Sequence, residues 1–187
     1  MDNGGEYYIK FLGGDVAAFD ELVKRYQNEM ILFIALYTDD YQIAEDISQD
    51  VFIKLYVNKP RYASSSSSFK TWLYTIAKHE SLSFLRRNKR DVSLSVLNSK
   101  AVIDDWLKPL LQEERKIALH KALSELGPEY RRYLYLACFD NLSTGEIARI
   151  EGKTTRYVSV KLYNAKQSLK RMIEKGDKYE ILRTEFE

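Results

Sequence analysis

Basic and amide side chains gather in one short stretch of the sequence, between residues 153 and 166. Guanidinium and amide groups suit the hydrogen-bonding edges of guanine and adenine, and an apolar side chain suits a thymine methyl group. Lysines beside them can neutralise phosphates without reading the sequence. The chemistry predicted here is recognition of a DNA duplex. The candidate residues are Lys153, Thr155, Arg156, Tyr157, Ser159, Val160, Lys161, Tyr163, Asn164 and Lys166.

A second set combines aromatic, basic and hydroxyl side chains between residues 62 and 87. Aromatic rings stack on unpaired bases while basic groups neutralise phosphates, so this composition suits single-stranded DNA. Trp72 falls at core spacing and is expected to be mostly buried, whereas Tyr74, Lys78 and His79 are expected to be freer. The candidates are Tyr62, Ser64, Ser65, Ser66, Ser67, Ser68, Trp72, Tyr74, Lys78, His79, Arg86 and Arg87.

A third set is acidic. Asp46 and Asp50 are one helical turn apart, with Glu45 and Gln49 beside them. Such a stripe is usually a solvated helix face. Next to Phe52, which we expect to be partly exposed, it also suits the docking of a basic helix from a partner protein.

The sequence offers no arrangement typical of catalysis. His79 and His120 are isolated, and neither a Ser/His/Asp set nor a phosphate-cradling glycine loop is visible. The single cysteine, Cys138, excludes an intramolecular disulfide and a cysteine-based zinc site, and its apolar neighbours predict a buried thiol. We therefore expect no enzyme activity, no cofactor and no metal.

Apolar residues at three- and four-residue steps predict an all-α fold. The first part of the chain is expected to hold three helices. One follows an N-cap at Asp15 and ends at Asp39, and the others cover residues 41–57 and 69–87. The residues before Asp15 are expected to be irregular, and the run of five serines is expected to form a surface loop.

The last part of the chain has the pattern of a helix-turn-helix. Helices are expected over residues 113–126 and 128–139. Ser143 and Glu146 have capping-box spacing and begin a short helix that ends near Gly152. A longer helix then runs to residue 175. In such a unit the second helix enters the major groove, which agrees with the position of the duplex-binding candidates.

Charge divides the chain in the same way. Residues 1–87 carry 10 basic and 12 acidic side chains, and residues 116–175 carry 12 basic and 6 acidic ones. A basic helical block of this size is typical of a DNA-binding domain, although a solvated helical surface fits the charge alone about as well. We expect two small helical domains, over residues 1–87 and 113–175, with a linker over 88–112 and an acidic C-terminal tail over 176–187.

Hydropathy gives no sign of a membrane segment. No apolar stretch approaches the roughly 18 residues that a membrane span needs, and no signal peptide is recognisable. We expect no membrane insertion and a cytoplasmic location.

Segments in both domains resemble, in the same order, the conserved regions of bacterial extracytoplasmic-function (ECF) sigma factors. Residues 40–52 resemble the polymerase-clamp-binding motif of their region 2, and residues 69–77 resemble their promoter-melting helix. Residues 123–131, 145–148 and 158–169 resemble their region 4.

This resemblance implies a protein that binds core RNA polymerase and promoter DNA. Region 2, within residues 1–87, would dock on the polymerase clamp through Glu45, Asp46, Gln49, Asp50 and Phe52. The candidates between residues 62 and 87 would capture the melted −10 element, and region 4, within 113–175, would read the −35 element as a duplex. Control by an anti-sigma factor is also expected.

The alternative is a stand-alone helix-turn-helix regulator that binds a palindromic duplex without polymerase. Its front domain would sense a signal or dimerise, and would have no need of a clamp-like acidic patch beside a melting helix. The segments that resemble region 2 therefore argue against it.

Overall fold

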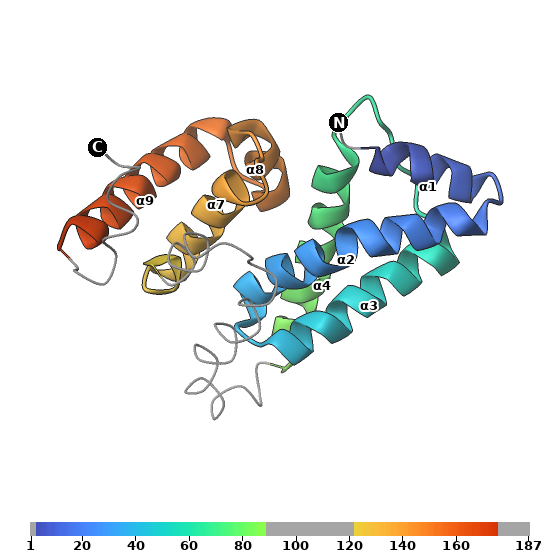
Figure 1. The fold of residues 1–187 in the computed structure, drawn as a ribbon, viewed down its shortest axis with the longest axis horizontal. Coiled ribbons are helices and arrows are strands. Elements are labelled where there is room, and N and C mark those ends of the chain that lie inside the picture. The colour runs from blue at the N-terminus through green and yellow to red at the C-terminus, as the bar shows by residue number, and fades with distance from the viewer. Residues whose placement is uncertain (1–2, 89–121, 176–187) are drawn as a thin grey trace. The chain divides into compact units, whose positions relative to one another are not determined.

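The computed structural model describes residues 3–88 and 122–175. Within these ranges the regular elements are all helices, so the predicted all-α class is confirmed. The helices belong to two compact units, each considered by itself: α1 to α4 form the first, and α7, most of α8, and α9 form the second (Figure 1). The predicted tail over 176–187 lies outside the described residues, as does the predicted linker apart from Asn88.

The first unit is built around α2 (Val16–Thr38), which packs against α1 (Gly4–Leu12), α3 (Tyr41–Asn58) and α4 (Phe69–Asn88). Its core is formed by the apolar stripes that the three- and four-residue steps predict. Fully buried members of these stripes are Leu22, Met30, Ile34, Ala44, Val51, Leu55 and Leu73. The amphipathic pattern thus gives both the helices and the faces by which they pack.

Aspartates begin both long helices of this unit. Asp15, as predicted, caps α2 by accepting a hydrogen bond from the amide of Ala18 (3.3 Å). Asp40 caps α3 in the same way, through the amide of Ile43 (3.0 Å). Asp39 adopts a left-handed conformation (φ 52°) that ends α2, so these two aspartates alone reverse the chain between α2 and α3.

The residues before Asp15 form the helix α1, so the expectation of an irregular start is wrong. Tyr8 and Phe11 of α1 are buried. A Cβ atom at Gly4 would lie 2.3 Å from Tyr26 Oη and 2.5 Å from Phe69 Cδ1. The absent side chain lowers helix propensity but lets α1 lie against α2 and α4, so packing outweighs propensity here.

The substitution Gly4→Ala is expected to destabilise the first unit by about 1–3 kcal/mol, the usual range for overpacking. Alanine in place of glycine ordinarily stabilises a helix by about 1 kcal/mol. The test is therefore whether the substitution lowers or raises the free energy of unfolding. Urea unfolding followed by circular dichroism measures it. Gly145→Ala is the matched control, because its Cβ would meet no atom closer than 4.0 Å. Equal stability of wild type and Gly4→Ala would contradict the close approach.

The second unit contains α7 (Pro128–Cys138), most of α8 (Thr144–Glu151) and α9 (Thr155–Lys175). Pro128 lies in the first turn of α7, as predicted. The predicted apolar stripe of α9 is buried, and α9 packs against α7. Its members are Val158, Leu162, Ala165, Leu169 and Ile173. Cys138, predicted to be buried, is exposed, because it is the last residue of α7 and lies beyond the buried turn formed by residues 133–136.

Candidate nucleic-acid and partner interfaces

The acidic stripe (Glu45, Asp46, Gln49 and Asp50) lies on the side of α3 that faces away from the core. Asp46, Gln49 and Asp50 are exposed, and Glu45 is half-buried. Phe52 does not accompany them, so the expectation that it is partly exposed is wrong. It is 6% exposed and lies edge-to-face against Phe19, with ring centroids 6.3 Å apart.

An apolar strip extends the acidic stripe toward the C-terminal end of α3. Ile53, Tyr56 and Val57 are 58%, 43% and 67% exposed. Residues 46, 50, 53 and 57 follow one another at helical steps, so acidic and apolar side chains share one exposed face. This strip was not predicted from the sequence. The available signal is that Ile53 and Val57 fall outside the spacing of the core residues of α3.

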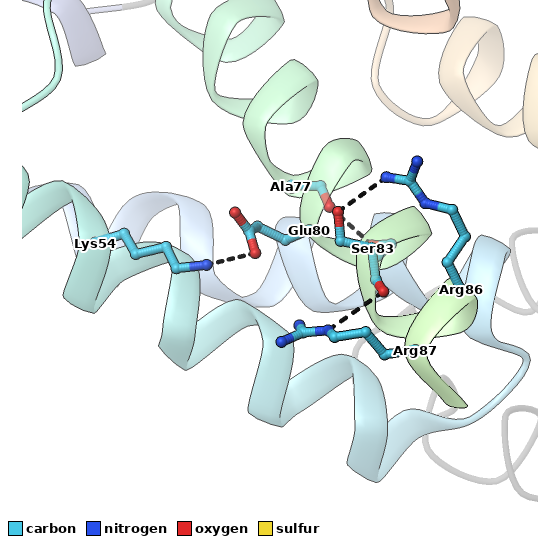
Figure 2. A network of polar contacts seen from close by, with 7 residues as sticks. Lys54, Ala77, Glu80, Ser83, Arg86 and Arg87 are labelled. Atoms are coloured by element: carbon cyan, nitrogen blue, oxygen red, sulfur yellow. Dashed lines mark hydrogen bonds and ion pairs between the residues drawn. The ribbon is translucent and has the colours of Figure 1, made fainter. Parts of the chain in front are cut away.

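A polar network joins α3 to α4 (Figure 2). Lys54 Nζ of α3 lies 2.5 Å from Glu80 Oε2 of α4. One turn further along α4, the hydroxyl and the carbonyl of Ser83 accept hydrogen bonds from Arg86 (3.2 Å) and Arg87 (3.4 Å). Both arginines are candidates for phosphate contact, and both stay exposed while α4 itself restrains their guanidinium groups.

The serines of the serine loop (residues 64–68) differ in their hydrogen bonds and in their exposure. Ser68 caps α4 by accepting a hydrogen bond from the amide of Thr71 (3.3 Å). Ser66 donates to the carbonyl of Ala63 (2.7 Å), which closes a tight turn. Ser64 and Ser65 are exposed in this turn, so they are the loop hydroxyls best placed to meet a ligand.

An aromatic cluster (Tyr8, Tyr62, Phe69 and Trp72) underlies the serine loop. The ring centroids of Tyr62 and Tyr8 are each 5.3 Å from that of Trp72. The Tyr62 hydroxyl donates to the carbonyl of Ser67 (3.0 Å), and the Tyr8 hydroxyl donates to the carbonyl of Pro60 (2.8 Å). Burial raises the pKa of Tyr8 to about 12, so this hydroxyl stays a donor at neutral pH. Tyr8 of α1 therefore contacts the chain on both sides of the serine loop, at Pro60 and at Trp72.

Several side chains of α4 differ in burial from the prediction. Tyr74, expected to be free, is fully buried and stacks on Phe33 with ring centroids 4.3 Å apart. Trp72, expected to be mostly core, is half-buried at the rim of the aromatic cluster. The core stripe of α4 runs through residues 73, 74 and 77, and this places position 72 toward its edge. Lys78, also expected to be free, is half-buried, whereas His79 is exposed as predicted.

The helix-turn-helix formed by α8 and α9 has the predicted construction. The amide of Ser143 donates to Glu146 Oε2 (3.0 Å), and the amide of Glu146 donates to Ser143 Oγ (3.3 Å), which is the capping box. Gly152 follows α8 with φ 62°, a left-handed conformation that glycine adopts without strain. Thr154 then caps α9 through the amide of Tyr157 (3.2 Å). Local hydrogen bonds thus define the start of both helices of the helix-turn-helix.

The exposed side of α9 carries most of the duplex-binding candidates. Val160 is 53% and Tyr163 64% exposed. The other candidates on the exposed surface are Lys153, Thr155, Arg156, Tyr157, Ser159, Asn164 and Lys166. Apart from Lys153, which lies in the turn before α9, these side chains project from a helix whose opposite stripe is buried.

Lys161 differs from the other candidates because it already has an anionic partner. Its Nζ lies 2.6 Å from Glu129 Oε2 of α7, and the Tyr157 hydroxyl donates to Glu129 Oε1 (2.8 Å). The hydrogen bond from Lys161 lowers the pKa of Glu129, and the same bond raises the pKa of Lys161. Both groups are therefore ionised at neutral pH. Sequence analysis missed Glu129, whose partners are 28 and 32 residues away along the chain.

Within residues 3–88 and 122–175, no group of three or more His, Cys, Asp and Glu side chains is placed to hold a metal ion. No helix in these ranges has both the length and the hydropathy of a membrane span.

Sequence comparison matches both units to one protein family. Residues 22–91 match Sigma-70 region 2, and residues 116–169 match Sigma-70 region 4. The chain is 28% identical over 158 residues to the ECF RNA polymerase sigma factor SigM of Bacillus subtilis, covering 84% of this chain and 96% of the relative. It is 27% identical over 172 residues to the RNA polymerase sigma-H factor of Pseudomonas aeruginosa, covering 86% and 89%.

Two solved structures share the fold. The sigma factor RpoE from Bartonella quintana, in complex with the anti-sigma factor NepR, matches with a TM-score of 0.62 at 20% identity, over 86% of this chain and 99% of that one. CnrH, in complex with the cytosolic domain of CnrY, matches with a TM-score of 0.61 at 17% identity, over 90% and 95%. At these identities the likeness concerns the fold alone.

Proposed function

Because the chain belongs to the sigma-70 family, as an ECF sigma factor of RNA polymerase, we propose how its surfaces divide the work of promoter-specific initiation. The alternative of a stand-alone helix-turn-helix regulator is not favoured, because residues 22–91 match Sigma-70 region 2. That the chain catalyses no reaction of its own, and that it is cytoplasmic, remain predictions.

The acidic stripe of α3 is the proposed contact with the polymerase clamp. Asp46, Gln49 and Asp50 support this because they are exposed on a helix whose other side is packed in the core. The apolar strip beside them adds surface that is dehydrated on docking. Phe52 is buried, so its proposed role is to hold α3 in the core and not to contact the polymerase itself.

The serine loop and α4 are the proposed site for the melted −10 element. Ser64 and Ser65 offer exposed hydroxyls, and the half-buried Trp72 offers an aromatic edge from a firmly packed cluster. An extruded base held there regains stacking and hydrogen bonds that it loses in the duplex. Arg86 and Arg87, at the far end of α4, are suited to the strand's phosphates.

The exposed side of α9 is the proposed reader of the −35 element. Arg156 and Asn164 carry the groups that match guanine and adenine edges, and Val160 can contact a thymine methyl group. Lys153 and Lys166 are suited to phosphates on either side. The support is that all five are exposed: four lie on one helix whose other stripe is buried, and Lys153 lies in the turn before it.

We also propose the predicted boundaries for these functions: region 2 over residues 1–87, a linker over 88–112, region 4 over 113–175 and a tail over 176–187. Control by an anti-sigma factor is a further proposal. Its support is that the two solved structures named above are complexes, one of them described as a complex with an anti-sigma factor.

The observation that carries the proposal is that one unit holds both the exposed acidic stripe of α3 and the serine loop with its aromatic cluster, and the other unit holds a capped helix-turn-helix. The test is co-purification of the tagged full chain with core RNA polymerase, followed by run-off transcription from a pool of promoters. Stoichiometric binding with new, sequence-dependent start sites is the expected result.

The matched variant for this experiment is Arg156→Ala/Asn164→Ala. It should retain polymerase binding and lose dependence on the −35 sequence, since each good base contact contributes about 1–3 kcal/mol of discrimination. If the chain failed to bind polymerase and by itself shifted the electrophoretic mobility of a palindromic duplex, the alternative function of a stand-alone regulator would be supported instead.

A further inference from the structure

A carboxylate lies within the cationic surface that we assign to the duplex. Glu129, in the first turn of α7, accepts hydrogen bonds from two residues of α9: the Tyr157 hydroxyl (2.8 Å) and Lys161 Nζ (2.6 Å). The Glu129 and Lys161 side chains are 37% and 27% exposed, so a ligand on this surface meets the pair rather than an isolated lysine.

The surroundings of the pair are cationic and aromatic. Lys161 Nζ lies 5.3 Å from the ring centroid of Tyr157 and 5.8 Å from that of Tyr130. Lys153 Nζ lies 5.6 Å from the centroid of the same Tyr157 ring. Two lysines therefore lie close to Tyr157, and Glu129 accepts hydrogen bonds from one of them and from Tyr157 itself.

A carboxylate in such a position opposes binding to the phosphate backbone, because it repels DNA and cancels the charge of one lysine. Backbone attraction is independent of sequence and supplies most of the affinity for non-promoter DNA. The biologically relevant quantity is the ratio of promoter to non-promoter affinity, and a device that weakens only the latter raises it.

We infer that Glu129 is a specificity-determining residue of this sigma factor, which withholds Lys161 from DNA phosphates and fixes Tyr157 on the reading surface. The inference rests on the proposed contact between α9 and the −35 duplex. It assigns Glu129 no direct contact with a base, so it acts as a positioning residue through Tyr157 and Lys161.

The test is the salt dependence of binding of the full chain to a promoter duplex and to a scrambled duplex of equal length. Glu129→Gln keeps an oxygen acceptor for Tyr157 but removes the charge, and this frees Lys161. The salt slope on scrambled DNA is expected to steepen by about 0.9, the value for one added phosphate contact. Affinity for scrambled DNA should rise about 3- to 10-fold near physiological salt, and the promoter-to-scrambled ratio should fall.

Three further variants separate the possible explanations. Lys161→Gln alone should leave the salt slope unchanged, because Lys161 makes no phosphate contact in the wild type. Glu129→Gln/Lys161→Gln should return to the wild-type slope, which shows that the freed charge is that of Lys161. Lys166→Gln should flatten the slope by about 0.9, because Lys166 is exposed on the same helix.

The outcomes distinguish this inference from the proposed function. A flattened slope for Lys166→Gln with an unchanged slope for Glu129→Gln would overturn the role of Glu129 and leave the α9–duplex contact intact. A flattened slope for Lys161→Gln would also overturn it, since Lys161 would then bind phosphate despite Glu129. An unchanged slope for Lys166→Gln would overturn the α9–duplex contact itself, and the inference with it.

Discussion

The double substitution Asp46→Lys/Asp50→Lys is expected to abolish transcription that depends on this sigma factor, while the first unit stays folded. Both side chains are exposed on α3, so reversing their charge removes no core contact. A basic partner helix that now meets two lysines loses attraction and gains repulsion. We expect affinity for core polymerase to fall by about 2–5 kcal/mol, or roughly 30-fold or more. Equilibrium binding of labelled sigma factor to core polymerase measures this.

The matched control is Glu6→Lys/Asp20→Lys, which makes the same change in net charge at exposed positions on α1 and α2. It should bind polymerase within about threefold of the wild type, because long-range attraction between exposed charges is screened at physiological salt. Wild-type affinity for Asp46→Lys/Asp50→Lys would remove the acidic stripe from the interface. An equal loss in both variants would point to net charge rather than to this site.

The second large effect is expected from Tyr74→Ala, which should lower the stability of the first unit by about 3–5 kcal/mol. Tyr74 is fully buried against Phe33, and truncation leaves a cavity of ring size in the core. Since domains are stable by only about 5–15 kcal/mol, much of the population would unfold at elevated temperature. Hydrogen exchange of the amides in α2 and α4 reports this change for the first unit alone.

His79→Ala is the control for Tyr74→Ala, because His79 is exposed on the next turn of the same helix. Its effect on exchange should stay within about 0.5 kcal/mol. If Tyr74→Ala kept normal exchange and yet lost promoter opening, Tyr74 would contact DNA, and its buried position would not describe the working complex.

Much of the fold follows from local patterns in the sequence. The stripes of α2, α3 and α9, the cap at Asp15 and the capping box at Ser143 each depend on residues three or four positions apart. Such spacing is visible without any knowledge of tertiary structure. For this reason the helix-turn-helix, which is closed by local hydrogen bonds, was predictable in detail.

The errors concern features that depend on distant residues. Helix α1 was not predicted, because glycine at position 4 is unfavourable for a helix locally. Glycine is needed there because the side chains of Tyr26 and Phe69 leave no room for a Cβ atom. The burial of Phe52 and Tyr74 depends on which edge of an apolar stripe meets another helix, and spacing does not determine this edge. Glu129 joins α9 across 28 and 32 residues, so no local pattern could reveal it.

The aromatic cluster provides an intrinsic fluorescence signal at the proposed −10 site. Trp72 has two tyrosine rings 5.3 Å away, close enough to pass their excitation energy to it. It lies half-exposed beneath the serine loop, so a base stacked on it would quench its emission. The substitution Trp106→Phe would leave Trp72 as the only tryptophan of the chain. Its intrinsic fluorescence would then follow promoter opening in real time, without any attached dye.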